Sequence, residues 1–199
     1  MKNNTYAGLR YSVKIAVLAA ISVVIMLFEF PLPFAPGFYK LDLSEAVVLM
    51  GGFAMGPLAA VIIELLKIAL NLVINGTDTA FVGEIANFII GCALVFPASL
   101  IYKYKKNLKS AIIGLIAGTL TLAVVGGIMN YFVLVPAYSY YYGIPLEGII
   151  GAAKAVNPLV VNFETMIIFA VVPFNAVKGI ICSALALLLY KRISKILHF

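Results

Sequence analysis

Between Lys109 and Glu147 the chain carries no charged side chain, and most of the residues in this stretch are apolar. An uncharged apolar stretch of about 18 residues or more is long enough to cross a bilayer as a helix. Similar apolar runs recur along the chain, in which 64% of the residues are hydrophobic and only 11% are charged. A soluble domain would carry about a quarter charged residues. The sequence therefore predicts an all-α integral membrane protein in which residues 1–199 form one domain.

Proline, glycine and basic residues divide the apolar runs into six predicted transmembrane helices. These helices are expected at about residues 11–30, 44–55, 57–74, 81–102, 109–135 and 159–190. None of them shows the alternation of polar and apolar residues that is typical of an outer-membrane barrel. The second helix is short and ends in "GGFAMGP", and short helices interrupted by Gly and Pro often line the site of a transporter. In the last helix, Pro173 is expected to mark a kink or the start of the helix proper, with an outer extension before it.

The basic residues favour six spans with both termini in the cytoplasm. This arrangement places ten of them on the cytoplasmic side: Lys2, Arg10, Lys14, Lys103, Lys105, Lys106, Lys109, Lys191, Arg192 and Lys195. Outside the spans, only Lys40 and Lys154 then lie on the outer side, whereas five or seven spans would put "YKYKKNLK" or "YKRISK" on the wrong face. The formal net charge of +6 therefore reflects orientation in the bilayer and not nucleic-acid binding.

Two long connections, residues 31–43 and 136–157, lie on the outer side in this topology. They contain "FPLPFAPGFYK" and "VPAYSYYYGIP", which are rich in aromatic residues and proline. Aromatic residues at this level can simply form the interfacial belt of a membrane protein. Two such connections on the same face as a buried Asn/Lys pair favour a lid over a pocket.

The sequence carries no motif of a known enzyme class. It lacks the P-loop G-x-x-x-x-G-K-[ST], so this chain is not expected to hydrolyse ATP, and it lacks H-E-x-x-H and G-x-S-x-G. Its acids within or near the spans are scattered and not paired. Cys92 and Cys182 lie in apolar runs and are expected to be small buried hydrophobes. We therefore expect no enzyme, no metal site and no cofactor.

Asn175 and Lys178 are the polar pair that most needs an explanation, because a lysine inside a membrane span is costly. They lie three residues apart and so on one face of the last helix. An amide both donates and accepts hydrogen bonds and an ammonium only donates. Together they suit a neutral, planar, amide-rich ligand with hydroxyl groups. Asp42 in "KLDLSE" is the nearest plausible acid to pair with Lys178.

Three further polar features lie within the predicted helices. Glu64 and Lys67 have the spacing of an intrahelical ion pair, for which a structural role is expected. Glu84 and Asn87 share the same spacing near the start of the fourth helix, where an acid is also favoured by the helix dipole. Asn130 lies towards the outer end of the fifth helix. Function and structure both remain open for Glu84.

Helix 1 carries small residues at every fourth position: Gly8, Ser12, Ala16 and Ala20. A stripe of small side chains lets another helix approach closely. Two explanations remain open, which are packing within this chain and docking to a partner membrane protein.

Five segments together resemble one known family: "PFAPGFYKLDLSE", "GGFAMGPLAAVIIELLK", "GEIANFIIG", "MNYFVLVPAY" and "PFNAVKGIICSALALLLYKR". They are similar to the riboflavin-binding S components, or RibU family, of energy-coupling factor (ECF) vitamin transporters. The resemblance covers nearly all of the chain in order. It implies a six-helix bundle of the cell membrane that captures riboflavin from outside, with riboflavin as transported ligand and not as cofactor. It also implies three partner subunits, a T-component membrane protein and two ATP-binding cassette ATPases.

The resemblance implies roles for residues that match the family's motifs. Eight of them are expected to bind the substrate: Asn130, Asn175, Lys178, Leu41, Phe38, Tyr39, Thr79 and Asn87. The amides and the lysine match the polar contacts of the flavin, and Leu41 with its aromatic neighbours matches the loop that covers the ring. Ala16 and Ala20, in a stripe that includes Ser12, match the surface that meets the T component.

Other functions remain open from the residues alone. An S component for thiamine, biotin or folate would share the architecture, although the absence of Trp disfavours a stacked thiamine cage. A self-sufficient proton-coupled carrier could use Glu64, Glu84 or Glu164 in a relay, but six helices without an internal repeat argue against it. A purely structural scaffold leaves Asn175 and Lys178 unexplained.

Overall fold

The computed structural model describes residues 2–77 and 79–197, and it gives side chains for residues 8–77 and 79–190. The elements, in chain order, are α1 (Lys2–Met26), β1 (Phe30–Pro31), β2 (Lys40–Leu41), α2 (Ser44–Met55), α3 (Pro57–Asn75), α4 (Val82–Tyr104), α5 (Leu108–Met129), the π-helix η1 (Asn130–Leu134), α6 (Val135–Tyr142), α7 (Leu146–Val156), α8 (Phe163–Met166), the π-helix η2 (Ile167–Val171) and α9 (Val172–Leu197). The two strands form an antiparallel pair in which Phe30 faces Leu41.

Within the described residues, five helical stretches are long and apolar enough to cross a membrane. They are Gly8–Met26, Pro57–Asn75, Val82–Tyr104, Leu108–Tyr142 and Phe163–Tyr190. A sixth apolar helix, α2, has only 12 residues. The chain is therefore a helical membrane protein as expected, with one of the six predicted helices too short to span a bilayer alone.

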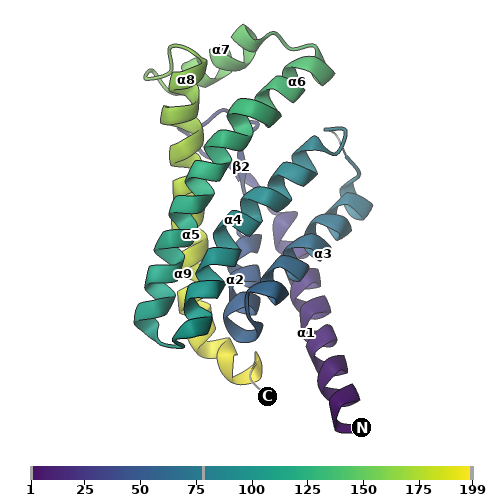
Figure 1. The fold of residues 1–199 in the computed structure, drawn as a ribbon. Helices are drawn as coiled ribbons and strands as arrows, with labels where there is room; N and C mark the ends of the chain where they lie inside the picture. The colour runs from purple at the N-terminus through teal and green to yellow at the C-terminus, as the bar shows by residue number, and fades with distance from the viewer. Residues whose placement is uncertain (1, 78, 198–199) are drawn as a thin grey trace.

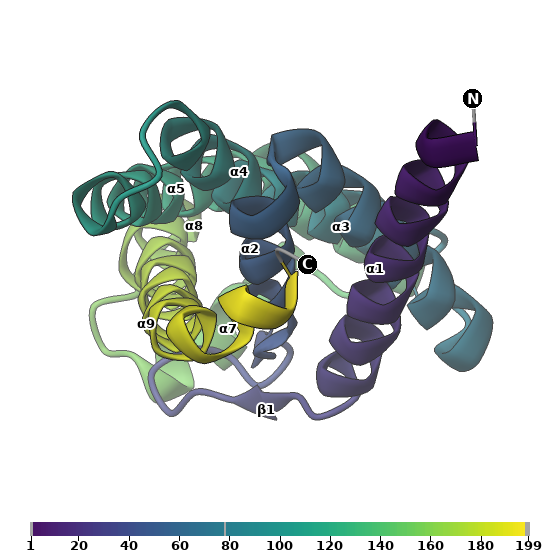
Figure 2. The same ribbon diagram turned by 90° about the horizontal axis from the view of Figure 1, so that it is seen from below.

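The helices run alternately in opposite directions (Figure 1). α1, α3 and α5 lead away from the end of the bundle where both chain ends lie, and α2, α4 and α9 lead back to it. Viewed from that end, α2 lies in the interior with the longer helices around it (Figure 2). Residues Ser44 to Phe53 of α2 are all buried, and α2 contacts α1, α3, α4 and α9. A helix without a polar face is expected in such a position.

One expectation about the outer connections is wrong. Residues 136–157 were expected to form an aromatic-rich loop, but they fold into α6 and α7, which are joined by a short turn at Gly143. α5, η1 and α6 form one continuous helical stretch, so the fifth helix extends well beyond the expected end at Val135. The last helix is likewise extended outward by α8 and η2, and α9 begins one residue before Pro173.

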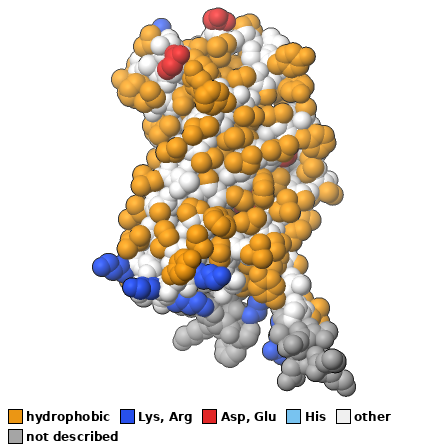
Figure 3. All heavy atoms as spheres, viewed as in Figure 1, with side chains coloured by type: hydrophobic (Ala, Val, Ile, Leu, Met, Phe, Trp, Pro, Cys, Tyr) orange, Lys and Arg blue, Asp and Glu red, His pale blue; other side chains and the backbone are white. Residues whose placement is uncertain are grey.

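The surface matches a protein that lies across a bilayer. Apolar side chains cover the sides of the bundle, and Lys and Arg side chains gather at the end that carries the α4–α5 turn (Figure 3). That turn contains exposed Lys103, Lys105, Lys106 and Lys109. The side chains of Lys2, Lys191, Arg192 and Lys195, which were expected on the same side, lie outside the described ones.

Helix lengths explain why space is left at the other end of the bundle. At 1.5 Å per residue α2 is about 18 Å long, which is short against a hydrocarbon core of about 30 Å. The Leu108–Tyr142 stretch has 35 residues and is about 52 Å long on the same scale. The longer helices therefore extend past the start of α2, and the β1–β2 connection lies in the region above it.

Candidate functional site

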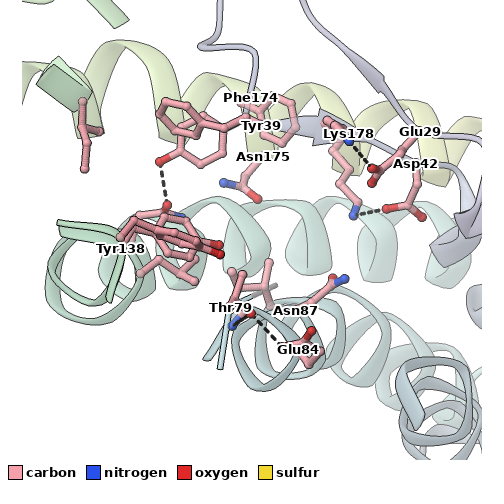
Figure 4. Close-up of a pocket in the computed structure, with 18 of the residues that line it drawn as sticks. Glu29, Tyr39, Asp42, Thr79, Glu84, Asn87, Tyr138, Phe174, Asn175 and Lys178 are labelled. Atoms are coloured by element: carbon pink, nitrogen blue, oxygen red, sulfur yellow. Dashed lines mark hydrogen bonds and ion pairs between the residues drawn. The ribbon is translucent and has the colours of Figure 1, made fainter. Parts of the chain in front are cut away.

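A cavity of about 710 Å³ lies at the end of the bundle away from the two termini. This volume falls within the range of about 300–1,000 Å³ that is usual for small-molecule sites. Its walls come from the β1–β2 connection and from the outer parts of α3, α4, η1, α6, α7 and α9. Polar side chains point into it from two sides (Figure 4).

Seven of the eight residues expected to bind substrate line this cavity. They are Phe38, Tyr39, Thr79, Asn87, Asn130, Asn175 and Lys178. Leu41 is placed differently, since its side chain is fully buried and packs with Ala35 and Phe174 beneath the β1–β2 connection. Contact between these side chains and a ligand stays a prediction.

The amides of Asn130 and Asn175 are held in the same way. Each donates from Nδ2 to the backbone carbonyl four residues earlier, Asn130 to Gly126 at 2.8 Å and Asn175 to Val171 at 2.9 Å. A carbonyl only accepts hydrogen bonds, so the Nδ2 atom must face it and Oδ1 must face away. Oδ1 of Asn130 accepts a bond of 2.7 Å from the hydroxyl of Tyr39. Oδ1 of Asn175 can therefore serve as an acceptor at the cavity wall.

Two π-helical segments set these amides in place. Asn130 is the first residue of η1, and the Val171 carbonyl that holds Asn175 is the last residue of η2. The two segments contact each other across the bundle. Single π turns inside α-helices occur frequently at functional sites. Gly126 also contributes, because a Cβ at this position would lie 2.6 Å from Nδ2 of Asn175.

Lys178 is paired with two acids. Its Nζ donates a bond of 2.9 Å to Oδ2 of Asp42, which confirms the expected pairing, and lies 3.1 Å from Oε1 of Glu45. Burial alone would raise the pKa of Asp42, but the ammonium groups of Lys178 and Lys67 and a bond from Ser44 outweigh it and hold the pKa well below its usual range. The carboxylate therefore stays ionised beside Lys178.

Sequence reasoning missed the second partner, Glu45. The "SE" that opens α2 could have pointed to it, because an acid in the first turn of a helix faces the start of that helix. What the sequence could not give is the position of this turn beside α9. It did predict the Glu64–Lys67 pair, and these side chains lie 2.8 Å apart.

The opposite wall of the cavity is polar as well. Thr79 donates to Oε2 of Glu84 at 2.8 Å and accepts from the backbone N–H of Gly83 at 2.9 Å, which fixes the start of α4. Asn87 lies one turn further along the same helix, and Asn71 of α3 also lines the cavity. In Figure 4 these α4 side chains face Asn175 and Lys178 across the space.

Aromatic side chains form the remaining walls. The rings of Tyr39 and Phe174 lie 5.6 Å apart, and Tyr138 and Tyr142 enter from α6. Burial, with a smaller contribution from Tyr138, raises the pKa of Tyr39, so its hydroxyl keeps the proton that it donates to Asn130. Phe174, Tyr138 and Tyr142 were not predicted individually, although the tyrosine-rich segment had been noted as a possible lid.

The small-residue stripe of α1 does not pack within the described chain. Gly8, Ser12, Ala16 and Ala20 are all exposed, while Ile15, Leu18 and Ala19 face the bundle. The acids of the alternative proton relay lie in three different settings. Glu64 is fully buried beside Lys67, Glu84 lines the cavity, and Glu164 is exposed in α8.

Known proteins share this architecture over nearly the whole chain. A solved structure described as the S component of a bacterial ECF transporter superposes with a TM-score of 0.74, at 33% identity, and covers 96% of this chain and 99% of its own. The riboflavin transporter RibU of Staphylococcus aureus (strain TCH60) is 36% identical over 93% of this chain and 90% of its own length. The riboflavin transporter FmnP of Bacillus subtilis (strain 168) is 29% identical over 89% and 88%.

The family comparison agrees. The profile of the family "ECF transporter, substrate-specific component" matches residues 10–190. Members of this family bind substrate and are not enzymes, and the relatives together with the apolar helices make the chain a multi-pass protein of a prokaryotic cell membrane. The chain belongs to the substrate-specific components of ECF transporters.

Proposed function

We propose that the chain captures riboflavin from outside the cell in the cavity under the β1–β2 connection. The observation that carries this proposal is the pair of groups on one turn of α9, where Oδ1 of Asn175 can accept and Nζ of Lys178 can donate. The imide edge of the isoalloxazine ring carries an N–H donor between two carbonyl acceptors. A donor and an acceptor side by side on the wall match two neighbouring groups of that edge.

The rest of the cavity suits the rest of the vitamin. The aromatic walls of Tyr39, Phe174 and Tyr138 offer faces for a large neutral ring system. The polar wall of Asn87, Thr79 and Glu84 offers partners for the hydroxyl groups of the ribityl chain. Lys178 is matched by Asp42 and Lys40 by Glu29, so these charged groups of the cavity occur as ion pairs, as a neutral ligand requires.

The same family supports a coupled mechanism of import. In this proposal the end with the basic α4–α5 turn faces the cytoplasm, because positive residues accumulate on that side. The exposed small-residue stripe of α1, including Ser12, Ala16 and Ala20, docks to a T-component membrane subunit. Two ATP-binding cassette ATPases supply the energy, since this chain has no P-loop of its own.

Riboflavin binding can be tested by titrating ligand-free protein in detergent and following the quenching of flavin fluorescence. We expect saturable quenching at one riboflavin per chain, with no displacement by an excess of thiamine or biotin. Displacement by either vitamin would reassign the substrate. Import is tested in proteoliposomes, where uptake should require the T component, the ATPases and internal ATP together. Uptake by this chain alone would support the secondary-transporter alternative.

A further inference from the structure

Lys178 is one member of a buried chain of ion pairs that runs from the cavity into the core of the bundle. Beyond its contacts with Asp42 and Glu45, the same Oε1 atom of Glu45 lies 3.2 Å from Nζ of Lys67. Lys67 in turn lies 2.8 Å from Oε1 of Glu64. Acids and bases thus alternate from Asp42 to Glu64 across the start of α2, α9 and α3.

The inner part of this chain is remote from the ligand space. The side chains of Glu45, Glu64 and Lys67 are 1%, 0% and 0% exposed, and none of the three is among the described residues that line the cavity. Removing buried charges from water is costly, and apolar residues of similar size often stabilise a protein as well or better. Stability alone therefore does not explain why these charges lie beneath the cavity.

The geometry explains it through the donors of Lys178. An ammonium has three N–H groups, and two of them are directed to Asp42 and Glu45. The third is then left for the cavity. Glu45 is itself held on both oxygens, since Oε2 accepts a bond of 3.1 Å from Ser44 and Oε1 contacts Lys67.

We propose that Glu45, held in place by Lys67, is a positioning residue that orients the Lys178 ammonium toward the flavin, although neither Glu45 nor Lys67 touches the ligand. This inference rests on the proposed binding of riboflavin. Without the Glu45 carboxylate, Lys178 retains only Asp42, and its ammonium turns toward that acid and away from the ligand.

Glu64 provides a matched control for Glu45. Both are fully buried glutamates that pair with Lys67, but only Glu45 also pairs with Lys178. The experiment compares Glu45→Gln with Glu64→Gln by riboflavin fluorescence titration and by the melting temperature of the ligand-free protein. We expect both variants to melt earlier, because each loses a charge-assisted contact. Glu45→Gln should weaken riboflavin binding about 10- to 100-fold, and Glu64→Gln by less than about threefold.

A double-mutant cycle separates positioning from general damage to the fold. In a Lys178→Ala background, Glu45→Gln should change the riboflavin Kd by less than about twofold, because the group it positions is gone. Equal effects of Glu45→Gln with and without Lys178 would overturn the inference, as would equal effects of the Glu45 and Glu64 variants or tighter binding by Glu45→Gln. If Glu45→Gln does not fold, Glu45→Asp keeps the charge but withdraws it by one methylene, and unchanged affinity in that variant would also overturn the inference.

The two levels of the proposal fail differently. Wild-type protein that does not bind riboflavin would overturn the proposed substrate, and the positioning role with it. Wild-type protein that binds riboflavin while both glutamate variants bind equally well would overturn the positioning role alone.

Discussion

At the scale of single residues, the position of the Asn175 amide depends on the absence of a side chain at Gly126. A Cβ there would lie 2.6 Å from Nδ2 of Asn175, so Gly126→Ala must displace the amide. We expect riboflavin binding to weaken by about tenfold. The melting temperature should change little, because the cost of overpacking is offset by the gain of about 1 kcal/mol for Ala over Gly in a helix. Gly151→Ala is the control, since a Cβ at Gly151 meets nothing within 4 Å, and unchanged binding by Gly126→Ala would contradict the site.

Asp42 gives a prediction with a defined pH dependence. The pKa of Asp42 is lowered in the folded protein, so its contribution to stability is fully present above its ordinary pKa of about 4 and is lost only as the pH falls through the lower folded value. Asp42→Asn should destabilise the ligand-free protein by about 1–3 kcal/mol. The difference in melting temperature between wild type and variant should stay constant from pH 8 to pH 5. A difference that shrinks over this range would show that the pKa of Asp42 is not lowered.

The sequence located the polar pair of α9 because a lysine in a membrane helix is conspicuous whatever surrounds it. It also named Asp42 as partner, since few acids lie near the spans. Glu45, Asn71 and Phe174 could not be assigned in the same way. Each faces the cavity or its ion pairs only because α2, α3 and α9 are packed together, and this packing is not encoded in the spacing along any one helix.

At the scale of helices, α4 and α5 are held together by the close approach of their backbones. Cβ atoms at Gly114 and Gly118 would lie 2.7 Å from the carbonyl oxygen of Ala98 and 2.4 Å from that of Leu94. These glycines are four residues apart, as in small-xxx-small helix interfaces. Because backbone cannot yield as a side chain can, Gly118→Ala should lower stability by about 1–3 kcal/mol.

Gly118 and Gly126 form an informative pair, since both belong to α5 and both receive the same substitution. For Gly118→Ala we expect a lower melting temperature with riboflavin affinity within about twofold of wild type, the reverse of the pattern for Gly126→Ala. Thermal unfolding and fluorescence titration on both variants check this. A Gly118→Ala protein that melts like wild type would show that the α4–α5 contact is looser than described.

The bounds of α2 followed from the sequence because glycine and proline punctuate it at "GGFAMGP". α6 and α7 did not, because residues 136–157 combine prolines with clustered tyrosines and lack a long apolar run. α6 is helical as a continuation of α5, and α7 buries Ile149 and Ala153 against its neighbours. Tertiary packing therefore decided a segment in which local signals favour a loop.

At the scale of the whole molecule, ligand capture and partner docking occupy separate surfaces. The cavity lies at one end of the bundle, and the exposed stripe with Ala16 lies along α1. Ala16→Leu should therefore reduce ATP-dependent uptake in proteoliposomes by about tenfold or more while leaving the riboflavin Kd unchanged. Val17→Leu, at a neighbouring exposed position of α1, is the control. Equal uptake by both variants would place the docking surface elsewhere.

The cavity itself could not be predicted from the sequence at this scale. It exists because a helix of 12 residues is surrounded by helical stretches of up to 35 residues, so that space remains above α2. Segment lengths could be read along the chain, but not which helix takes the central position. The apolar character of the spans, by contrast, was sufficient to predict a helical membrane protein.

The most direct test of the central claim is the identity of the ligand that the protein retains. The chain should be purified in detergent from flavin-rich cells, and its visible absorption spectrum and the mass of the extracted ligand should be measured. The account predicts yellow protein with about one riboflavin per chain, and colourless protein when Asn175→Ala and Lys178→Ala are combined. Colourless wild-type protein that also fails to quench added riboflavin, or a double variant that retains riboflavin as wild type does, would contradict it.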